Sequence, residues 1–264
     1  MLIIFFILGL IIGSFLNVVV YRLNLAESIL GRSLCPHCKK QIRWYDNFPL
    51  LSFVALGAKC RDCGEKISWQ YPVVEFFTGV VFALVGNYFF ISSYALSWLD
   101  TVFYLGVFSA LLVVFVYDLK YMEIPMIIIW LGSGWTLIYL LLFDWLNYGF
   151  QVQILSFRTF SGVLGAMVAF LFFFIIVSVS KEKWMGMGDA YLALLAGLIV
   201  GFPNIFLMLT LAFAIGAVFG VILVILGKKK MQSQIPFAPF LVSAVIILVL
   251  LQKAIPLIGY LLFG

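Results

Sequence analysis

The stretch Trp184-Met185-Gly186-Met187-Gly188-Asp189 decides how the surrounding chain is arranged. The charged residues Lys181, Glu182 and Lys183 come just before it. The run from Ala190 to Val200 that follows is apolar except for Tyr191. A switch from charge to sustained apolarity is typical of the start of a membrane helix. The stretch therefore predicts that Asp189 lies at a membrane surface, where a carboxyl group can meet water.

Composition assigns the whole chain to the membrane. Of its 264 residues 65% are hydrophobic and only 10% are charged, with a mean hydropathy of +1.20, far outside the range of soluble globular proteins. A span needs roughly 20 apolar residues to cross about 30 Å of hydrocarbon. We therefore predict an all-α polytopic membrane protein of about eight transmembrane helices. The apolar runs are Leu2–Tyr21, Val73–Tyr94, Leu96–Tyr117, Ile124–Phe143, Phe157–Ser180, Ala190–Val200 with its flanks, Ile205–Leu226 and Phe237–Leu251, the last with a possible extension from Ile255 to Phe263.

The positive charges predict the orientation of these spans. The first run lacks a basic region before it and meets its first positive charge at Arg22, so we expect it to stay as a span rather than to be cleaved as a signal. If the N-terminus lies outside, Arg158 and Lys253 are the only two of the 16 Lys and Arg residues that fall outside. The net charge of +5 then reports topology and attraction to anionic lipid, not nucleic-acid binding.

A second acid shares the predicted inner side with Asp189. Asp118 ends the apolar run from Thr101 to Tyr117, and in this orientation both carboxyl groups face the same side. Two neighbouring acids can share a proton and act as acid and base together. Asp189 could instead cap its helix, whereas a carboxylate at a helix C-terminus, as at Asp118, opposes the helix dipole. Gly186 and Gly188 could adopt positive φ and let a substrate backbone approach closely.

Four cysteines predict a metal site in the one sizeable polar segment, Leu23 to Tyr71. They form two Cys-x2-Cys units, and four thiolates at this spacing complete a tetrahedral shell for a structural zinc ion. A redox pair is the competing interpretation, and His37 is expected to face solvent. The predicted fold thus has a small zinc-knuckle loop on the cytoplasmic side between helices 1 and 2. The predicted ligands are Cys35, Cys38, Cys60 and Cys63.

Polar residues around this loop allow two interpretations. The aromatic side chains between Ile42 and Ser52 could rest on the lipid interface, and Asp46-Asn47 could simply turn the chain. Glu75 lies about one turn inside an apolar run, which is costly unless the side chain is paired or functional. Asn17 could make an interhelical hydrogen bond or have a functional role.

Together these motifs resemble the type IV prepilin peptidase family of membrane aspartic proteases. The matching stretches, in family order, are Gly13-Ser14-Phe15-Leu16-Asn17-Val18-Val19 with Tyr21-Arg22, the two cysteine units around Trp44-Tyr45-Asp46-Asn47-Phe48-Pro49, Ile67-Ser68, Tyr71-Pro72-Val73-Val74-Glu75, Asp118, Gly186-Met187-Gly188-Asp189 and Ile235-Pro236-Phe237-Ala238-Pro239-Phe240.

The resemblance implies an enzyme of the inner membrane of a prokaryote that cuts the leader of prepilins and pseudopilins after glycine, on the cytoplasmic side. Asp118 and Asp189 would be the catalytic pair, and the four cysteines the metal ligands. Members with the cysteine loop commonly also methylate the new N-terminus with S-adenosylmethionine. The implied parts are a first span (1–22), a zinc loop and possible methyltransferase region (23–71) and a peptidase domain (72–264). Candidates for the cofactor site are Asp46, Asn47, Glu65 and Glu75.

Two positions depart from the family pattern. Tyr191 stands where a lysine is often found, and Met126 follows Pro125 where an aspartate is often found. Neither change removes a predicted catalytic carboxyl group. Two further hypotheses are a peptidase without methylation and a non-catalytic assembly or transport protein whose zinc loop docks a cytosolic partner.

Overall fold

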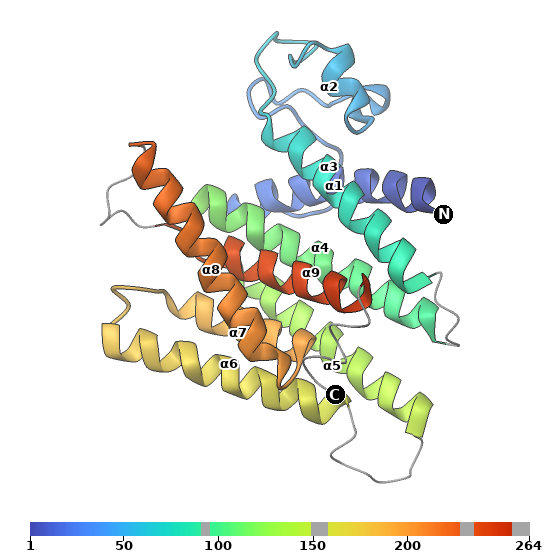
Figure 1. The fold of residues 1–264 in the computed structure, drawn as a ribbon. Coiled ribbons are helices and arrows are strands. Elements are labelled where there is room, and N and C mark those ends of the chain that lie inside the picture. The colour runs from blue at the N-terminus through green and yellow to red at the C-terminus, as the bar shows by residue number, and fades with distance from the viewer. Residues whose placement is uncertain (91–95, 149–157, 228–234, 255–264) are drawn as a thin grey trace. The chain divides into compact units, whose positions relative to one another are not determined.

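The structure is a computed structural model that describes residues 1–90, 96–148, 158–227 and 235–254. Every regular element in these ranges is a helix, apart from two isolated antiparallel bridges (Figure 1). The chain divides into two compact units, Met1–Val113 and Val114–Gly264. The main helices are α1 (Leu2–Asn24), α3 (Gln70–Val85), α4 (Ser97–Tyr121), α5 (Met126–Tyr148), α6 (Arg158–Ser180), α7 (Met187–Val200), α8 (Asn204–Ile225) and α9 (Ala238–Ala254), with short turns η1 (Trp44–Asn47), α2 (Leu51–Ala55) and η2 (Gly86–Phe90).

The prediction of an all-helical membrane protein is confirmed. Six of the described helices are long and apolar enough to cross a membrane, namely α1, α3 with η2, α4, α5, α6 and α8. Two more, α7 and α9, are apolar but shorter. Each coincides with one of the eight apolar runs, although the number of spans stays a prediction. Residues 91–94 of the second run, Phe157, Lys228 to Lys230 and the possible extension from Ile255 lie outside the described residues.

In the first unit α1 and α3 pack closely through small residues (Figure 1). A Cβ atom added to Gly9 would lie 2.7 Å from the Cα atom of Gly79, and one added to Gly13 would lie 2.8 Å from the Cα atom of Glu75. Larger residues at either glycine would force the helices apart. Small residues allow this close approach within a membrane, where packing replaces the hydrophobic effect as the main attraction between helices.

The second unit has its closest helix contact between α6 and α7 (Figure 1). A Cβ atom added to Gly197 would lie 2.5 Å from the carbonyl oxygen of Gly165 and 2.6 Å from the backbone of Ala166. Helix α9 also contacts α7 and is deeply buried, with Ala238 and Leu241 fully covered. Helices α7 and α9 thus pack within the second unit, and the start of each contributes to the site described next.

Candidate active site and metal centre

Asp118 occupies the last turn of α4, in the second unit. Its side chain is only 5% exposed, and its Oδ2 atom is buried without a hydrogen-bond partner among the described residues. The backbone N–H of Ala238, the first residue of α9, faces this carboxyl group. The first N–H groups of a helix lack intrahelical partners and carry partial positive charge. The start of α9 therefore offsets the unfavourable dipole of α4 at Asp118.

Asp189 lies in the first turn of α7, as its third residue. The residue that caps this helix is Gly186, and no side chain caps it. The Gly186 N–H faces the Asp189 carboxyl group, which is the arrangement of an acid reaching back from the third helical position. The carboxyl group thus benefits from the positive end of α7, as the sequence suggested, but Asp189 is not itself the capping residue.

The two aspartates are brought together within the second unit. They lie close enough for the charge of Asp118 to act on Asp189. One contact that sets their approach is between Gly188 and the turn after α4, because a Cβ atom added to Gly188 would lie 3.1 Å from the Cβ atom of Ile124. Two acids held in this way can share one proton, so that one donates while the other accepts.

The two glycines of the stretch do not need positive φ. Gly186 has φ −81°, and neither Gly186 nor Gly188 is among the described residues with positive φ. That part of the sequence interpretation is wrong. A Cβ atom at Gly186 would meet nothing closer than 4.0 Å, whereas Gly188 lies against Ile124. Packing therefore explains Gly188, while open space beside Gly186 agrees with room for a substrate backbone.

The departure at position 191 lies in an aromatic cluster. The Tyr191 ring lies 5.6 Å from that of Trp130 on α5 and 5.7 Å from that of Phe170 on α6. Residues two apart on a helix point to nearly opposite faces. Tyr191 therefore packs α7 against α5 and α6 and does not share the face of Asp189. Met126, the other departure, is the first residue of α5.

The four cysteines form one cluster in the first unit. Their sulfur atoms all lie within 4.8 Å of one another, and those of Cys35 and Cys63 are 3.9 Å apart. A tetrahedral zinc ion with Zn–S bonds of about 2.3 Å separates its ligands by about 3.8 Å, so the cluster fits such an ion. The prediction that these residues come together is confirmed. His37 is exposed and outside the cluster, as expected.

The two cysteine loops share one backbone pattern, repeated 25 residues apart along the sequence. In the first, Cys35 N–H donates to Lys40 O and Ile42 N–H to Ser33 O; in the second, Cys60 N–H donates to Glu65 O and Ile67 N–H to Ala58 O. Both loops are closed by an isolated bridge, Leu34 with Gln41 and Lys59 with Lys66. Two equivalent knuckles that each supply two thiols are suited to a closed, structural metal site.

The electrostatics of the cluster also suit a cation. Backbone N–H groups of Cys63 and Asp62 stabilise the Cys60 thiolate and lower its pKa to about 7. At Cys63 the Glu65 N–H also favours the thiolate, but desolvation and the neighbouring sulfurs outweigh it and raise the pKa to about 12. Four thiolates this close repel one another unless a divalent cation lies between them.

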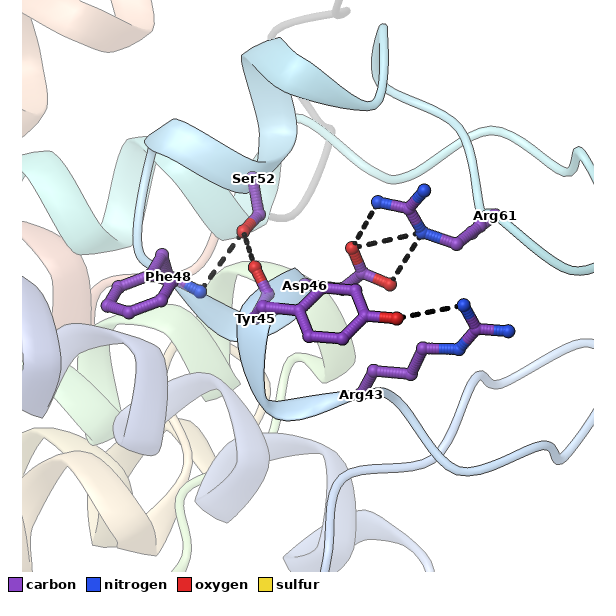
Figure 2. Close-up of polar contacts among 6 residues, drawn as sticks. All are labelled: Arg43, Tyr45, Asp46, Phe48, Ser52 and Arg61. Carbon is purple, nitrogen blue, oxygen red and sulfur yellow. Dashed lines mark hydrogen bonds and ion pairs between the residues drawn. The ribbon is translucent and has the colours of Figure 1, made fainter.

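An ion pair ties the second knuckle to the segment between the cysteines. Arg61 donates to both carboxylate oxygens of Asp46 at 2.7 to 3.1 Å, as Figure 2 shows. The Arg61 guanidinium lowers the pKa of Asp46, chiefly through these hydrogen bonds. Ser52 closes the same turn by donating to Tyr45 O and accepting from Phe48 N–H (Figure 2).

Glu75, which lies inside an apolar run, has hydrogen-bond partners. Its carboxylate, 7% exposed on α3, accepts a 2.9 Å hydrogen bond from Leu50 N–H and contacts the Ser14 hydroxyl of α1. Asn17 also bridges these helices, because its Nδ2 atom donates to Tyr71 O and its Oδ1 atom accepts from Gln70. Both polar residues of the apolar runs thus have interhelical partners.

The four candidates for a cofactor site lie in different surroundings. Asp46 is held by Arg61 and Glu75 by Leu50, while Asn47 and Glu65 are exposed. The role of these four residues toward S-adenosylmethionine stays a prediction.

Asp144 was missed by the sequence interpretation, and Arg22 was considered only as a positive charge and as part of a family motif. Asp144 on α5 accepts hydrogen bonds from the N–H groups of Arg158 and Thr159 and so caps α6. Arg22, only 8% exposed, donates to the carbonyl groups of Ser28, Ile29 and Arg32. An apolar setting could have singled out Asp144, but no sequence signal names its partners, which lie 14 and 15 residues away.

An all-helical membrane protein with two interacting aspartates at helix ends defines a candidate membrane aspartic peptidase. Two family models match the chain: the bacterial peptidase A24 N-terminal domain over residues 7–89 and the type IV leader peptidase family over residues 105–221. The first range holds the four cysteines and the second holds Asp118 and Asp189.

Curated relatives agree with these models. The chain is 33% identical over 248 residues to a prepilin leader peptidase/N-methyltransferase of Bacillus subtilis, covering 94% of this chain and 93% of the relative. Proteins of the same name from Vibrio cholerae (33% identity; 78% and 81% covered) and Pseudomonas aeruginosa (30% identity; 90% and 86% covered) are also similar. No solved structure matches the chain. The chain belongs to the type IV leader peptidase family and is an enzyme, so the family prediction is confirmed.

Proposed function

We propose that this chain is an aspartic endopeptidase that removes the leader of type IV prepilins and pseudopilins. The observation that carries the proposal is that Asp118, at the end of α4, lies close enough to Asp189, at the start of α7, to act on it electrostatically. The names of the relatives, which are prepilin leader peptidases, supply the substrate class.

The proposed mechanism uses the two carboxyl groups in different states of protonation. One aspartate stays protonated and donates a hydrogen bond, while the other removes a proton from a water molecule, which attacks the carbonyl carbon of the last leader residue, a glycine. Proton donation to the leaving nitrogen then completes hydrolysis without an acyl-enzyme. The open space beside Gly186 would admit an extended substrate backbone, because nothing lies within 4.0 Å of a Cβ atom placed there.

The site is proposed to face the cytoplasm in the inner membrane of a prokaryote, with about eight spans and the N-terminus outside. The charge bias of the sequence supports this orientation. Helix α7 is only about 21 Å long at 1.5 Å per residue, shorter than the hydrocarbon core. The exposed residues Lys181, Glu182 and Lys183, just before it, agree with an entrance at the membrane surface.

We further propose S-adenosylmethionine-dependent methylation of the new N-terminus, on the names of the relatives alone. The cofactor supplies the methyl group when bound, and no residue is assigned to it. Zinc in the four-cysteine cluster is proposed as a structural ion in residues 23–71. Cys35, Cys38, Cys60 and Cys63 would hold it, and no step of peptide hydrolysis involves it.

The test is a cleavage assay with membranes that contain the chain and a prepilin with a Gly-Phe junction. We expect a product that begins with phenylalanine, and loss of cleavage when the junction glycine is replaced by valine. Labelled S-adenosylmethionine added to the same reaction should mark the product alone. Absence of cleavage with several prepilins and pseudopilins would overturn the peptidase assignment; cleavage without label would overturn only the methylation.

A further inference from the structure

A set of large apolar side chains is exposed on the polar segment between α1 and α3. Leu51 and Val54, three residues apart on α2, are 72% and 78% exposed, and the nearby Trp44 and Phe48 are also exposed. The rings of Trp44 and Phe48 pack edge to face at 6.1 Å between centroids. We call Trp44, Phe48, Leu51 and Val54 the α2 apolar face. A face of this kind costs free energy in water, and it marks an interaction surface.

The depth of this face relative to the membrane follows from two contacts with α3. Leu50, directly before α2, donates its N–H to Glu75, which is about 8 Å along α3 from the first residue of that helix. Phe53, within α2, packs its ring 5.0 Å from that of Trp69, directly before α3. Helix α2 therefore lies beside the first two turns of α3, a membrane-span candidate. The headgroup layer of a bilayer is about 5 to 8 Å thick on each side, which matches this depth.

The anchor is strong enough to hold α2 at this depth. Leu50 adopts φ +60°, a conformation that a branched side chain rarely takes without support. Its N–H partner, Glu75, is buried and also contacts Ser14. Releasing the hydrogen bond would leave a buried carboxylate without its backbone donor. The segment from Phe48 to Ala55 is thus fixed to the membrane helix.

The charges of the same segment are those of a surface that meets lipid headgroups. The basic side chains of Lys39 and Arg43 precede the α2 apolar face, and those of Lys59 and Lys66 follow it; all four residues are exposed. Lys40 and Arg61 are also exposed but pair with Asp62 and Asp46. Exposed apolar and aromatic residues flanked by Lys and Arg are the pattern of interfacial anchors. Val73, Phe76 and Phe77, in the first two or three turns of α3, are also exposed.

We propose that the α2 apolar face inserts into the headgroup and upper acyl region of the membrane that α3 crosses, so that the zinc knuckles are held at the lipid surface. The occupant of the face is lipid, not a soluble partner or the substrate. The inference uses only contacts within residues 1–113, and it stands apart from the assignment of the peptidase site.

The proposal is tested by replacing single residues of the full chain with the photoreactive amino acid benzoylphenylalanine, in cell membranes. Leu51 and Val54 are the test positions, and His37, exposed on the first knuckle, is the matched control. After irradiation we expect phospholipid adducts at positions 51 and 54, at least fivefold above those at position 37. Zinc content and abundance equal to those of the unmodified chain show that each variant is folded.

Two outcomes would overturn the proposal. Lipid labelling at positions 51 and 54 no higher than that of the non-irradiated sample would place the face in water, and adducts with a protein at positions 51 and 54 would give it a protein partner instead. A second measurement uses the double variant Leu51→Asp with Val54→Asp, which should increase trypsin cleavage of residues 32–66 several-fold in opened vesicles, while His37→Asp should not. Unchanged cleavage in the double variant would equally contradict a lipid anchor.

Discussion

Arg61 of the second cysteine knuckle donates hydrogen bonds to both carboxylate oxygens of Asp46. This contact joins the metal loop to the aromatic turn Trp44–Asn47. The two residues are separated by 15 positions in the sequence, and their contact is bidentate. Fork-shaped pairing of this kind fixes orientation as well as distance. The order of the turn Trp44–Asn47 should therefore depend on the Arg61 side chain.

Replacing Arg61 by glutamine should loosen the turn without removing the metal. We expect amide hydrogen exchange of residues 44–48 to rise several-fold, with Arg61→Lys giving an intermediate rise because lysine keeps the charge but loses the fork. Lys66→Gln, an exposed change on the same knuckle, is the control. Because Arg61 lowers the pKa of Asp46 below its ordinary 3.8, the pair should persist from about pH 5 to 8 and weaken only in stronger acid. Identical exchange in Arg61→Gln and the native chain would argue against this link.

Removing one thiol should remove the zinc. We expect about one ion per chain in the purified protein and much less than one after Cys63→Ser, since a structural site needs all four ligands. His37→Ala should keep the full zinc content, because His37 is exposed and lies outside the cluster. Elemental analysis by mass spectrometry gives the ratio directly. A full zinc content in Cys63→Ser would show that the four sulfurs do not act as one site.

The two glycines before Asp189 should respond differently to alanine. At Gly188 the new methyl group would press on Ile124 at 3.1 Å, so overpacking should cost about 1 to 3 kcal/mol of stability and lower protein abundance. At Gly186 the methyl group meets nothing within 4.0 Å, so abundance should stay native while leader cleavage falls at least tenfold if the substrate approaches there. Abundance on immunoblots and cleavage rate per enzyme separate the two effects. Native cleavage by Gly186→Ala would remove Gly186 from the site.

Glu75 should hold α2 because its side-chain oxygen accepts a hydrogen bond from Leu50 N–H, and its negative charge should not be needed. Glutamine can still accept from Leu50 N–H through its amide oxygen, so Glu75→Gln should leave residues 48–55 protected from hydrogen exchange. Glu75→Ala removes the acceptor, and we expect exchange in this segment to rise at least tenfold. Equal exchange in the glutamine and alanine variants would show that the hydrogen bond does not anchor α2.

The sequence could predict features that depend on residues close together in the chain. Each helix start or end lies within a few residues of an apolar run, and the paired Cys-x2-Cys units define a cluster because each knuckle folds on itself. Helix α7 begins at Met187, so the flank before Ala190, including Gly188 and Asp189, is already helical, while Gly186 has an extended backbone.

Long-range hydrogen-bond partners could not be predicted, because the donors are backbone N–H groups, which every residue except proline has. Asp118 faces the N–H of Ala238, 120 positions further on, and Glu75 accepts from the N–H of Leu50. No side-chain pattern marks either donor. Asp144 was overlooked for the same reason, since it caps α6 through two backbone groups. The function of Asp118 and Asp189 rests on the family and on their proximity, and it stays a proposal.

The most direct measurement is leader cleavage by Asp118→Asn and Asp189→Asn in membranes, compared with Glu123→Gln, an exposed acid five residues from Asp118. The asparagine changes keep the shape of each side chain but remove the proton that the mechanism moves. We predict that each abolishes cleavage, by at least a thousandfold, at native protein abundance, while Glu123→Gln cleaves at the native rate. Cleavage retained by either asparagine variant would contradict the assignment of the two aspartates as the catalytic pair.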